Sequence, residues 1–320
     1  MRERGDGSGP MRIAVIGTGG VGGYFGARLA AAGDEVGFIA RGEHGRTLRE
    51  RGLRLRSTHG DLHLPEVVAT DDARDLGPCD VVLFCVKSYS TEQAATQHLP
   101  PLMGDDTAVI SLQNGMGNLE RIAAVVGWEH VLGGLALIFS TITEPGVIEH
   151  TAGPARIVFG ELDGAARPRT SRFLERCEAA GIDAAVPPDI NVAMWDKFAF
   201  ICALAGTTAA VRLPVGEIRE APRTWQLFRR LVEETYDVAR AEGVAVPEGA
   251  VEERLAFARS LEPDTHSSLH HDLVTGGRME LDALHGAVVR MADRHGVEVP
   301  MSEAVHAILE PWARRNAEQR

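Results

Sequence analysis

The first half of the chain alternates short apolar runs with glycine-rich turns and helical segments. Short runs rich in apolar and β-branched residues are typical of strands that are buried on both faces of a sheet. We therefore expect strands at 11–16, 35–40, 80–86, 108–112, 131–139, 147–149, 156–160 and 183–186, a hairpin at 53–64, and helices at 24–32 and 169–180.

The pattern changes after Pro187 and Pro188. From there on, apolar residues recur with the helical period, and no strand pattern follows. We expect helices at 191–210, 222–242, 248–260, 278–295 and 301–315. A chain of 320 residues is long for one core, so two domains are expected. We place them at 11–187 and 188–320, after a disordered extension at 1–10.

The first predicted strand runs directly into a glycine-rich loop with the spacing G-x-G-x-x-G. The loop consists of Gly17, Thr18, Gly19, Gly20, Val21 and Gly22. In dinucleotide-binding folds the first glycine permits a tight turn, the second lets the backbone approach a pyrophosphate, and the third allows close packing of helix and strand. The phosphates then lie at the positive end of the helix. The alternative is a purely structural turn, but the strand–loop–helix context favours a dinucleotide-binding Rossmann-type domain.

The end of the second predicted strand indicates which dinucleotide binds. A carboxylate there accepts a hydrogen bond from the ribose of NAD, whereas an arginine accommodates the 2′-phosphate of NADP. Here the strand ends in Ala40, Arg41 and Gly42, and no carboxylate occurs before Glu43. We therefore expect NADPH with Arg41 as the phosphate ligand, although a solvated surface arginine is the alternative.

Composition limits the remaining classes of partner. With 33 Lys and Arg against 45 Asp and Glu, the net charge is −12, which argues against nonspecific binding to nucleic acid or anionic membranes. No apolar run is long enough to span a bilayer, and residues 1–10 lack the apolar core of a signal peptide. The four cysteines form no C-x-x-C pair. We expect a cytoplasmic protein.

Two lysines are candidates for chemistry. Lys87 directly follows a predicted strand, where ligands of open α/β sheets gather, and it could contact the cofactor or an anionic substrate. Lys197 lies in a helix in which Asp196 is the only other ionisable residue. Burial would lower its pKa toward the range useful for proton transfer. For both, the alternative is an ordinary lysine whose ammonium group reaches solvent.

Several motifs together resemble the ketopantoate reductases, which are the 2-dehydropantoate 2-reductases of pantothenate biosynthesis. The glycine loop is followed in order by Lys87, by Asn-Gly-Met-Gly at 114–117 and by Trp-Asp-Lys at 195–197. Ser-Ser-Leu-His-His-Asp at 267–272 and Gly-Arg-Met-Glu-Leu-Asp at 277–282 complete the series. The resemblance implies a Rossmann domain, a helical domain and NADPH-dependent reduction of a 2-oxo acid. It also implies a homodimer or a monomer, of which we expect the homodimer.

The resemblance also implies roles for single residues. Lys197 would be the general acid, with Glu280 as a second catalytic residue, and Lys87 and Asn114 would border both nicotinamide and substrate. Ser268 and Glu280 would contact the substrate. A plain carboxylate at a helix start is the alternative for Glu280. The nearby histidines at 266, 270 and 271 lack a carboxylate–histidine pattern, so we expect no metal.

The chain departs from this family at three positions. The asparagines that bind substrate in the family would fall at Ile201, Ala205 and Val215, and Lys197, Ile201 and Ala205 share one helix face. We therefore expect no strong preference for ketopantoate over acids of similar size that lack its hydroxyl, unless Ser268 or His285 replaces the lost contacts. There are two alternatives to a ketopantoate reductase. One is a paralogue that reduces a less polar 2-oxo acid, and the other is a non-catalytic NADPH-binding protein.

Overall fold

The computed structural model describes residues 9–318, and the chain divides into two compact units. The first unit contains the chain up to Gln113 and residues 118–190. The second contains residues 114–117 and the chain from Asn191 onward. Residues 1–8 of the predicted N-terminal extension lie outside the described range.

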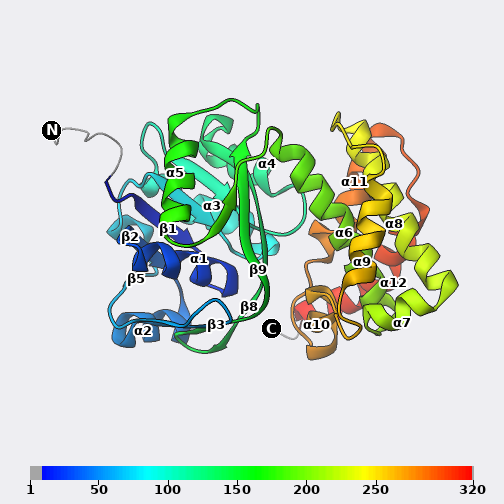
Figure 1. The fold of residues 1–320 in the computed structure, drawn as a ribbon, viewed down its shortest axis with the longest axis horizontal. Coiled ribbons are helices and arrows are strands. Elements are labelled where there is room, and N and C mark those ends of the chain that lie inside the picture. Colours follow the sequence, from blue (N-terminus) through cyan, green and yellow to red (C-terminus); the bar gives the residue numbers. More distant parts are fainter. Residues whose placement is uncertain (1–8, 319–320) are drawn as a thin grey trace. The chain divides into compact units, whose positions relative to one another are not determined.

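The first unit is built on one mixed β-sheet (Figure 1). Its strands are β1 (Arg12–Ile16), β2 (Glu35–Ile39), β3 (Leu53–Ser57), β4 (Leu62–Leu64), β5 (Val68–Thr70), β6 (Val81–Phe84), β7 (Ala108–Ser111), β8 (Val131–Glu144), β9 (Val147–Glu161) and β10 (Asp183–Ala185). The order is β4-β3-β9-β8-β7-β6-β1-β2-β5, with β10 beside β9. Strands β5, β2, β1, β6, β7 and β8 pair in parallel, whereas β8–β9 and β3–β4 are antiparallel.

Five α-helices accompany this sheet in the described part of the unit. They are α1 (Gly20–Ala31), α2 (Gly42–Arg51), α3 (Thr91–His98), α4 (Asn118–Val126) and α5 (Pro168–Ala179). Helix α1 contacts β1, β2, β8 and β9, and Phe25 and Leu29 on it are fully buried. The central strands β1 and β6 are buried along almost their whole length, as the uninterrupted apolar runs predict.

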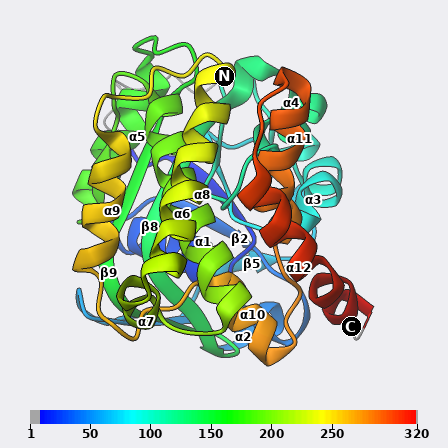
Figure 2. The same ribbon diagram turned by 90° about the vertical axis from the view of Figure 1, so that its right-hand side faces the viewer.

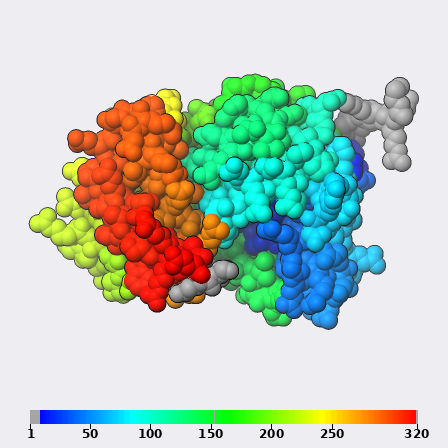
Figure 3. Space-filling model, turned by 180° about the vertical axis from the view of Figure 1, so that it is seen from behind, coloured from blue at the N-terminus to red at the C-terminus, as the bar shows by residue number. Residues whose placement is uncertain are grey.

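All regular secondary structure among the described residues of the second unit is helical. It contains most of α6 (Ile190–Val211), then α7 (Val215–Glu220), α8 (Pro222–Ala241), α9 (Ala250–Ser260), α10 (Ser268–Thr275), α11 (His285–His295) and α12 (Pro300–Glu318). Figure 2 shows α6 and α8 side by side, and the Phe200 and Phe228 rings are in contact between them. In the view of Figure 3, α12 (red) runs alongside α11 (orange), and the two are in contact.

The predicted fold class, a Rossmann-type domain followed by a helical domain, is confirmed. Three local predictions are wrong. The expected helix at 278–295 is interrupted, because a 3₁₀ turn, η5 (Leu281–Ala283), precedes α11, and Leu284 between them is non-helical. Helix α1 begins at Gly20 rather than at Tyr24, and the two short strands expected at 147–149 and 156–160 are one strand, β9.

Candidate active site

The glycine loop forms a tight turn directly before helix α1. Gly17 has φ +92°, and a Cβ there would lie 2.7 Å from the Val86 amide nitrogen. A Cβ on Gly22 would lie 2.4 Å from the Gly17 carbonyl oxygen, whereas the space beside Gly19 is open. Gly19 caps α1 without a side chain, and the first turn of the helix has no acidic residue. This helix end therefore fits the phosphates of a dinucleotide.

The other loop residues hold this turn in place. The buried Thr18 hydroxyl donates to the Ile39 carbonyl oxygen at 3.2 Å, which ties the loop to the end of β2. A Cβ on Gly20 would lie 2.2 Å from the Ser140 carbonyl oxygen of β8, so this position also requires glycine. Val21 is partly buried.

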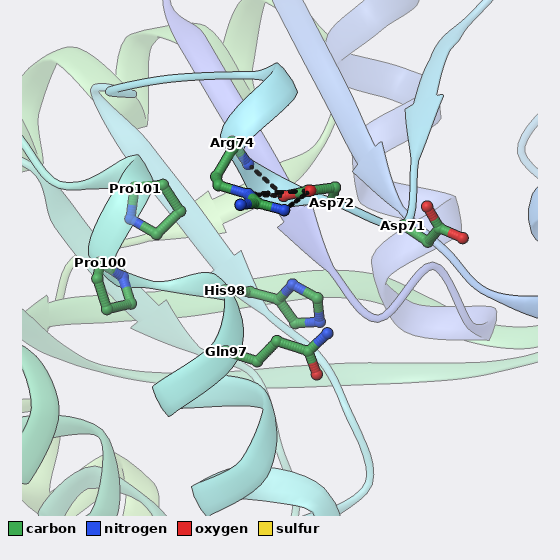
Figure 4. A pocket seen from close by; sticks show the side chains of 7 residues that line it. All are labelled: Asp71, Asp72, Arg74, Gln97, His98, Pro100 and Pro101. Atoms are coloured by element: carbon green, nitrogen blue, oxygen red, sulfur yellow. Dashed lines mark hydrogen bonds and ion pairs between the residues drawn. The ribbon is translucent and has the colours of Figure 1, made fainter.

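Arg41 lies at the C-terminal end of β2, beside a polar groove. Ile39 of β2 pairs with Thr70 of β5, which brings Asp71 and Asp72 to the same edge of the sheet as Arg41. These two aspartates help to line a groove of about 650 Å³ (Figure 4), together with Arg74, Gln97, His98, Pro100 and Pro101. Burial, followed by the positive charge of Arg41, lowers the pKa of His98.

Charge near Arg41 is partly neutralised. Asp72 forms an ion pair with Arg74, whereas Arg41 is exposed and forms no ion pair among residues 9–318. The guanidinium of Arg41 is therefore available to an anion.

Lys87 is exposed where β6 ends, and it precedes a short 3₁₀ turn at 88–90. The structure thus places Lys87 at the strand end that the sequence predicted.

Lys197 lies in the buried helix α6 and donates to Asn114. Its Nζ is 3.0 Å from the Asn114 Oδ1 atom. Trp195, Phe198 and Ala199 around it are buried, while Lys197 itself keeps a partly accessible side chain. Burial lowers the pKa of Lys197 to about 8, although the negative charge of Glu280 opposes the shift. The lysine can therefore hold or release a proton near neutral pH.

The loop that carries Asn114 packs with the helical unit. Gly115 has φ +86°, and a Cβ there would lie 2.3 Å from the Ala283 carbonyl oxygen, so only glycine fits. The Met116 amide donates to the same carbonyl at 3.0 Å. Turn η5 thus fixes the loop from one side, and Glu280 immediately precedes η5. Residues from three distant parts of the sequence therefore meet at Lys197.

Glu280 is buried, with 8% of its surface exposed. Glu280 is the N-cap residue of η5, and its side chain forms no capping hydrogen bond there. Its negative charge acts on Lys197 and favours the ammonium form. The arrangement resembles a proton donor beside a carboxylate that stabilises its charged state.

Two residues that the sequence did not single out hold the helix next to Lys197. The Tyr236 hydroxyl donates to Asp196 Oδ1 at 2.6 Å, and Arg254 lies 3.2 Å from Asp196 Oδ2. Burial, followed by this hydrogen bond, raises the pKa of Tyr236. Asp196 was visible as an unusual charge in an apolar helix, but its partners come from α8 and α9. No sequence signal connects them to it.

The two adjacent serines differ in their surroundings. Ser267 is the N-cap of α10: its Oγ accepts from the His270 amide at 3.0 Å and pairs with the Thr208 hydroxyl at 2.7 Å. Ser268 is exposed, and its hydroxyl forms no hydrogen bond within the described chain. A ligand could therefore reach Ser268 but not Ser267.

His285 and the other histidines offer little to a ligand. His285 is fully buried, and a Cβ on Gly206 would lie 2.4 Å from its Nε2. The rings of His266 and His270 lie 4.3 Å apart. Over residues 9–318, no three His, Cys, Asp or Glu side chains are placed to hold a metal ion.

None of the helices within residues 9–318 has both the length and the apolar character needed to cross a membrane.

Comparison with known proteins decides the family. A family described as "Ketopantoate reductase PanE/ApbA" matches residues 13–164, and "Ketopantoate reductase PanE/ApbA C terminal" matches residues 189–312. The chain belongs to the ketopantoate reductase family. As a member of this family it is an oxidoreductase, and family members bind a nicotinamide cofactor.

Several known proteins are similar to this chain over nearly its whole length. A 2-dehydropantoate 2-reductase of Halobacterium salinarum is 33% identical, covering 91% of this chain and 95% of that one. "Uncharacterized oxidoreductase YkpB" of Bacillus subtilis is 32% identical over 94% and 99%. The crystal structure of a PanE/ApbA family ketopantoate reductase from Ralstonia eutropha superimposes with a TM-score of 0.87 at 31% identity, covering 96% and 100%.

More distant ketopantoate reductase folds serve other substrates. D-mandelate dehydrogenase, in a ternary structure with NADH and anilino(oxo)acetate, has a TM-score of 0.85 but only 20% identity, covering 96% of this chain and all of that one. At this identity the likeness concerns the fold alone. The ketopantoate reductase fold by itself therefore does not specify which acid is reduced.

Proposed function

We propose that this protein reduces a 2-oxo acid to the 2-hydroxy acid with NADPH, as 2-dehydropantoate 2-reductases do. The observation that carries the proposal is the partly accessible Lys197, whose ammonium donates to Asn114 beside the charge of Glu280. Such an arrangement suits a proton donor to a carbonyl oxygen. The named relatives at about 30% identity support the same class of reaction.

Each residue has one task in the proposed reaction. When bound, NADPH would supply the hydride for the reduction of the carbonyl group. Lys197 transfers its proton to the carbonyl oxygen as negative charge develops there, and solvent then returns a proton to Nζ. Asn114 orients the ammonium through its Oδ1. Glu280 keeps the lysine protonated, because its charge favours the ammonium form.

The cofactor would be held by the first unit. The uncapped start of α1 and the open space at Gly19 fit the pyrophosphate, and the exposed Arg41 suits the 2′-phosphate. Lys87 and Asn114 would contact nicotinamide and substrate, and Ser268 and Glu280 the substrate. We propose NADPH rather than NADH as the cofactor, with these contacts to it and to the substrate.

A panel assay tests the reductase. NADPH oxidation is followed with ketopantoate, pyruvate and branched 2-oxo acids, and the product is identified as the hydroxy acid. We expect turnover with at least one acid and its loss in Lys197→Ala. Binding of NADPH without turnover of any acid would instead support a non-catalytic NADPH-binding protein.

We also propose a cytoplasmic homodimer. A role in pantothenate biosynthesis is the alternative to the substrate class that we propose below. A ketopantoate reductase from Staphylococcus aureus that is described as dimeric shares the fold at 21% identity. Light scattering at several protein concentrations measures the oligomer. Growth of a pantothenate-requiring strain that expresses this chain tests the pathway assignment.

A further inference from the structure

The accessible surface of helix α6 on either side of Lys197 is apolar. Side chains three and four positions apart lie on the same helix face, so Met194 and Ile201 flank Lys197. Both are partly exposed. Ala205 continues this row one turn later and is buried. Any small molecule whose carbonyl lies at Lys197 therefore meets apolar side chains along this helix.

The polar groups of the same helix are engaged elsewhere. Asp196 is bound by Tyr236 at 2.6 Å and by Arg254 at 3.2 Å. The first hydroxyl on the Lys197 face is that of Thr208, which is fully buried and bonds the Leu204 carbonyl oxygen at 2.7 Å. At 1.5 Å per residue it also lies about 16 Å along the helix from Lys197. Neither group can serve a hydroxyl of a small acid bound at Lys197.

We propose that the substrate is a 2-oxo acid with an apolar side chain, and that Ile201 contacts this side chain. The proposal rests on the reductase function proposed above. Helix α6 offers no hydrogen bond to a substrate hydroxyl beside Ile201, whereas substrate methyl groups gain from the contact with Ile201. Lys197, Asn114 and Glu280 remain to bind the polar head of the acid.

Two acids that differ only in one hydroxyl test the substrate class. Ketopantoate is 4-hydroxy-3,3-dimethyl-2-oxobutanoate, and 3,3-dimethyl-2-oxobutanoate lacks its hydroxyl. With saturating NADPH we expect kcat/KM for the deoxy acid to equal or exceed that for ketopantoate, by up to about 100-fold, the limit for an apolar pocket that meets one extra hydroxyl. A preference for ketopantoate above about tenfold overturns the proposal, because another group must then bind the hydroxyl.

Variants test the part of Ile201. Ile201→Asn places an amide beside Lys197, and we expect it to raise the ratio of kcat/KM for ketopantoate over the deoxy acid by about tenfold or more. Leu227→Asn introduces the same change at a partly buried position of α8 and should leave this ratio unaltered. An unchanged ratio in a folded Ile201→Asn protein that binds NADPH overturns the contact.

A second variant covers the case in which the asparagine prevents folding. Ile201→Ala removes most of the apolar contact, so kcat/KM should fall about five- to tenfold for the deoxy acid but hardly for pyruvate, whose methyl is too small to reach it. Equal losses for both acids overturn the contact. Absence of turnover with every acid would contradict the reductase function itself, whereas a strong preference for ketopantoate would contradict only its substrate class.

Discussion

Neutralising Glu280 should move the alkaline limit of the enzyme's pH profile. Lys197, the proposed proton donor, has a pKa of about 8 and would have to be protonated to act. For a single titration with this pKa, the protonated fraction falls about tenfold between pH 7 and pH 9. A lysine without the effect of burial would lose its proton only above about pH 10. The kcat/KM of the wild type should therefore decline above pH 8.

The direction of the shift follows from charge. The carboxylate of Glu280 raises the pKa of Lys197 against the larger effect of burial. Glu280→Gln removes that charge, so the pKa of Lys197 falls further and the decline begins at lower pH. With an effective dielectric constant of about 20, a unit charge shifts a neighbouring pKa by about one unit at about 12 Å and by about two units at about 6 Å. We expect a shift of about one to two pH units toward acid.

The assay compares matched variants. The kcat/KM for the best 2-oxo acid is measured from about pH 6 to pH 10.5 at constant ionic strength with saturating NADPH. Asp282→Asn is the control, because it also removes one carboxylate but an exposed one that is paired with Arg290. The reasoning is refuted if the wild type stays active up to pH 10, or if both variants shift the profile equally.

Further predictions concern the cofactor, the proton donor and stability. Arg41→Ala should weaken NADPH binding by about 1.5–3 kcal/mol, the scale of a charge-assisted hydrogen bond, and leave NADH binding nearly unchanged; calorimetric titration with both cofactors decides this. Lys197→Ala should lower kcat by about 10²-fold or more with little effect on the Kd of NADPH, and a nearly active, folded variant would exclude it as the proton donor. Burial lowers the pKa of His285 to about 4. As pH falls below 6.5, His285 therefore becomes protonated in the unfolded chain before it does so in the folded protein. In urea unfolding, His285 should contribute about 2 kcal/mol to the free energy of unfolding that is lost between pH 7.5 and pH 5. The loss should therefore be smaller in His285→Leu but unchanged in His63→Leu, where the histidine is exposed.

Local patterns predicted much of the first unit, because its central strands and its glycine loop depend on neighbouring residues. Buried apolar runs mark β1, β6 and β7, and the spacing of Gly17, Gly19 and Gly22 predicts the turn into α1. Strand order and the joining of two short segments into β9 could not be predicted this way. They depend on pairing between strands that are far apart in the sequence.

The sequence alone also indicated the family, through the order of its motifs, and a candidate proton donor, because Lys197 is conspicuous in an apolar helix. The environment of Lys197 was decided only by the tertiary structure. Asn114 reaches Lys197 because Gly115 and Met116 pack on Ala283, and Glu280 acts on it because η5 interrupts a segment whose periodicity predicted a continuous helix. A pKa depends on burial and on charges brought near through space, and neither is encoded in the spacing of residues along the chain.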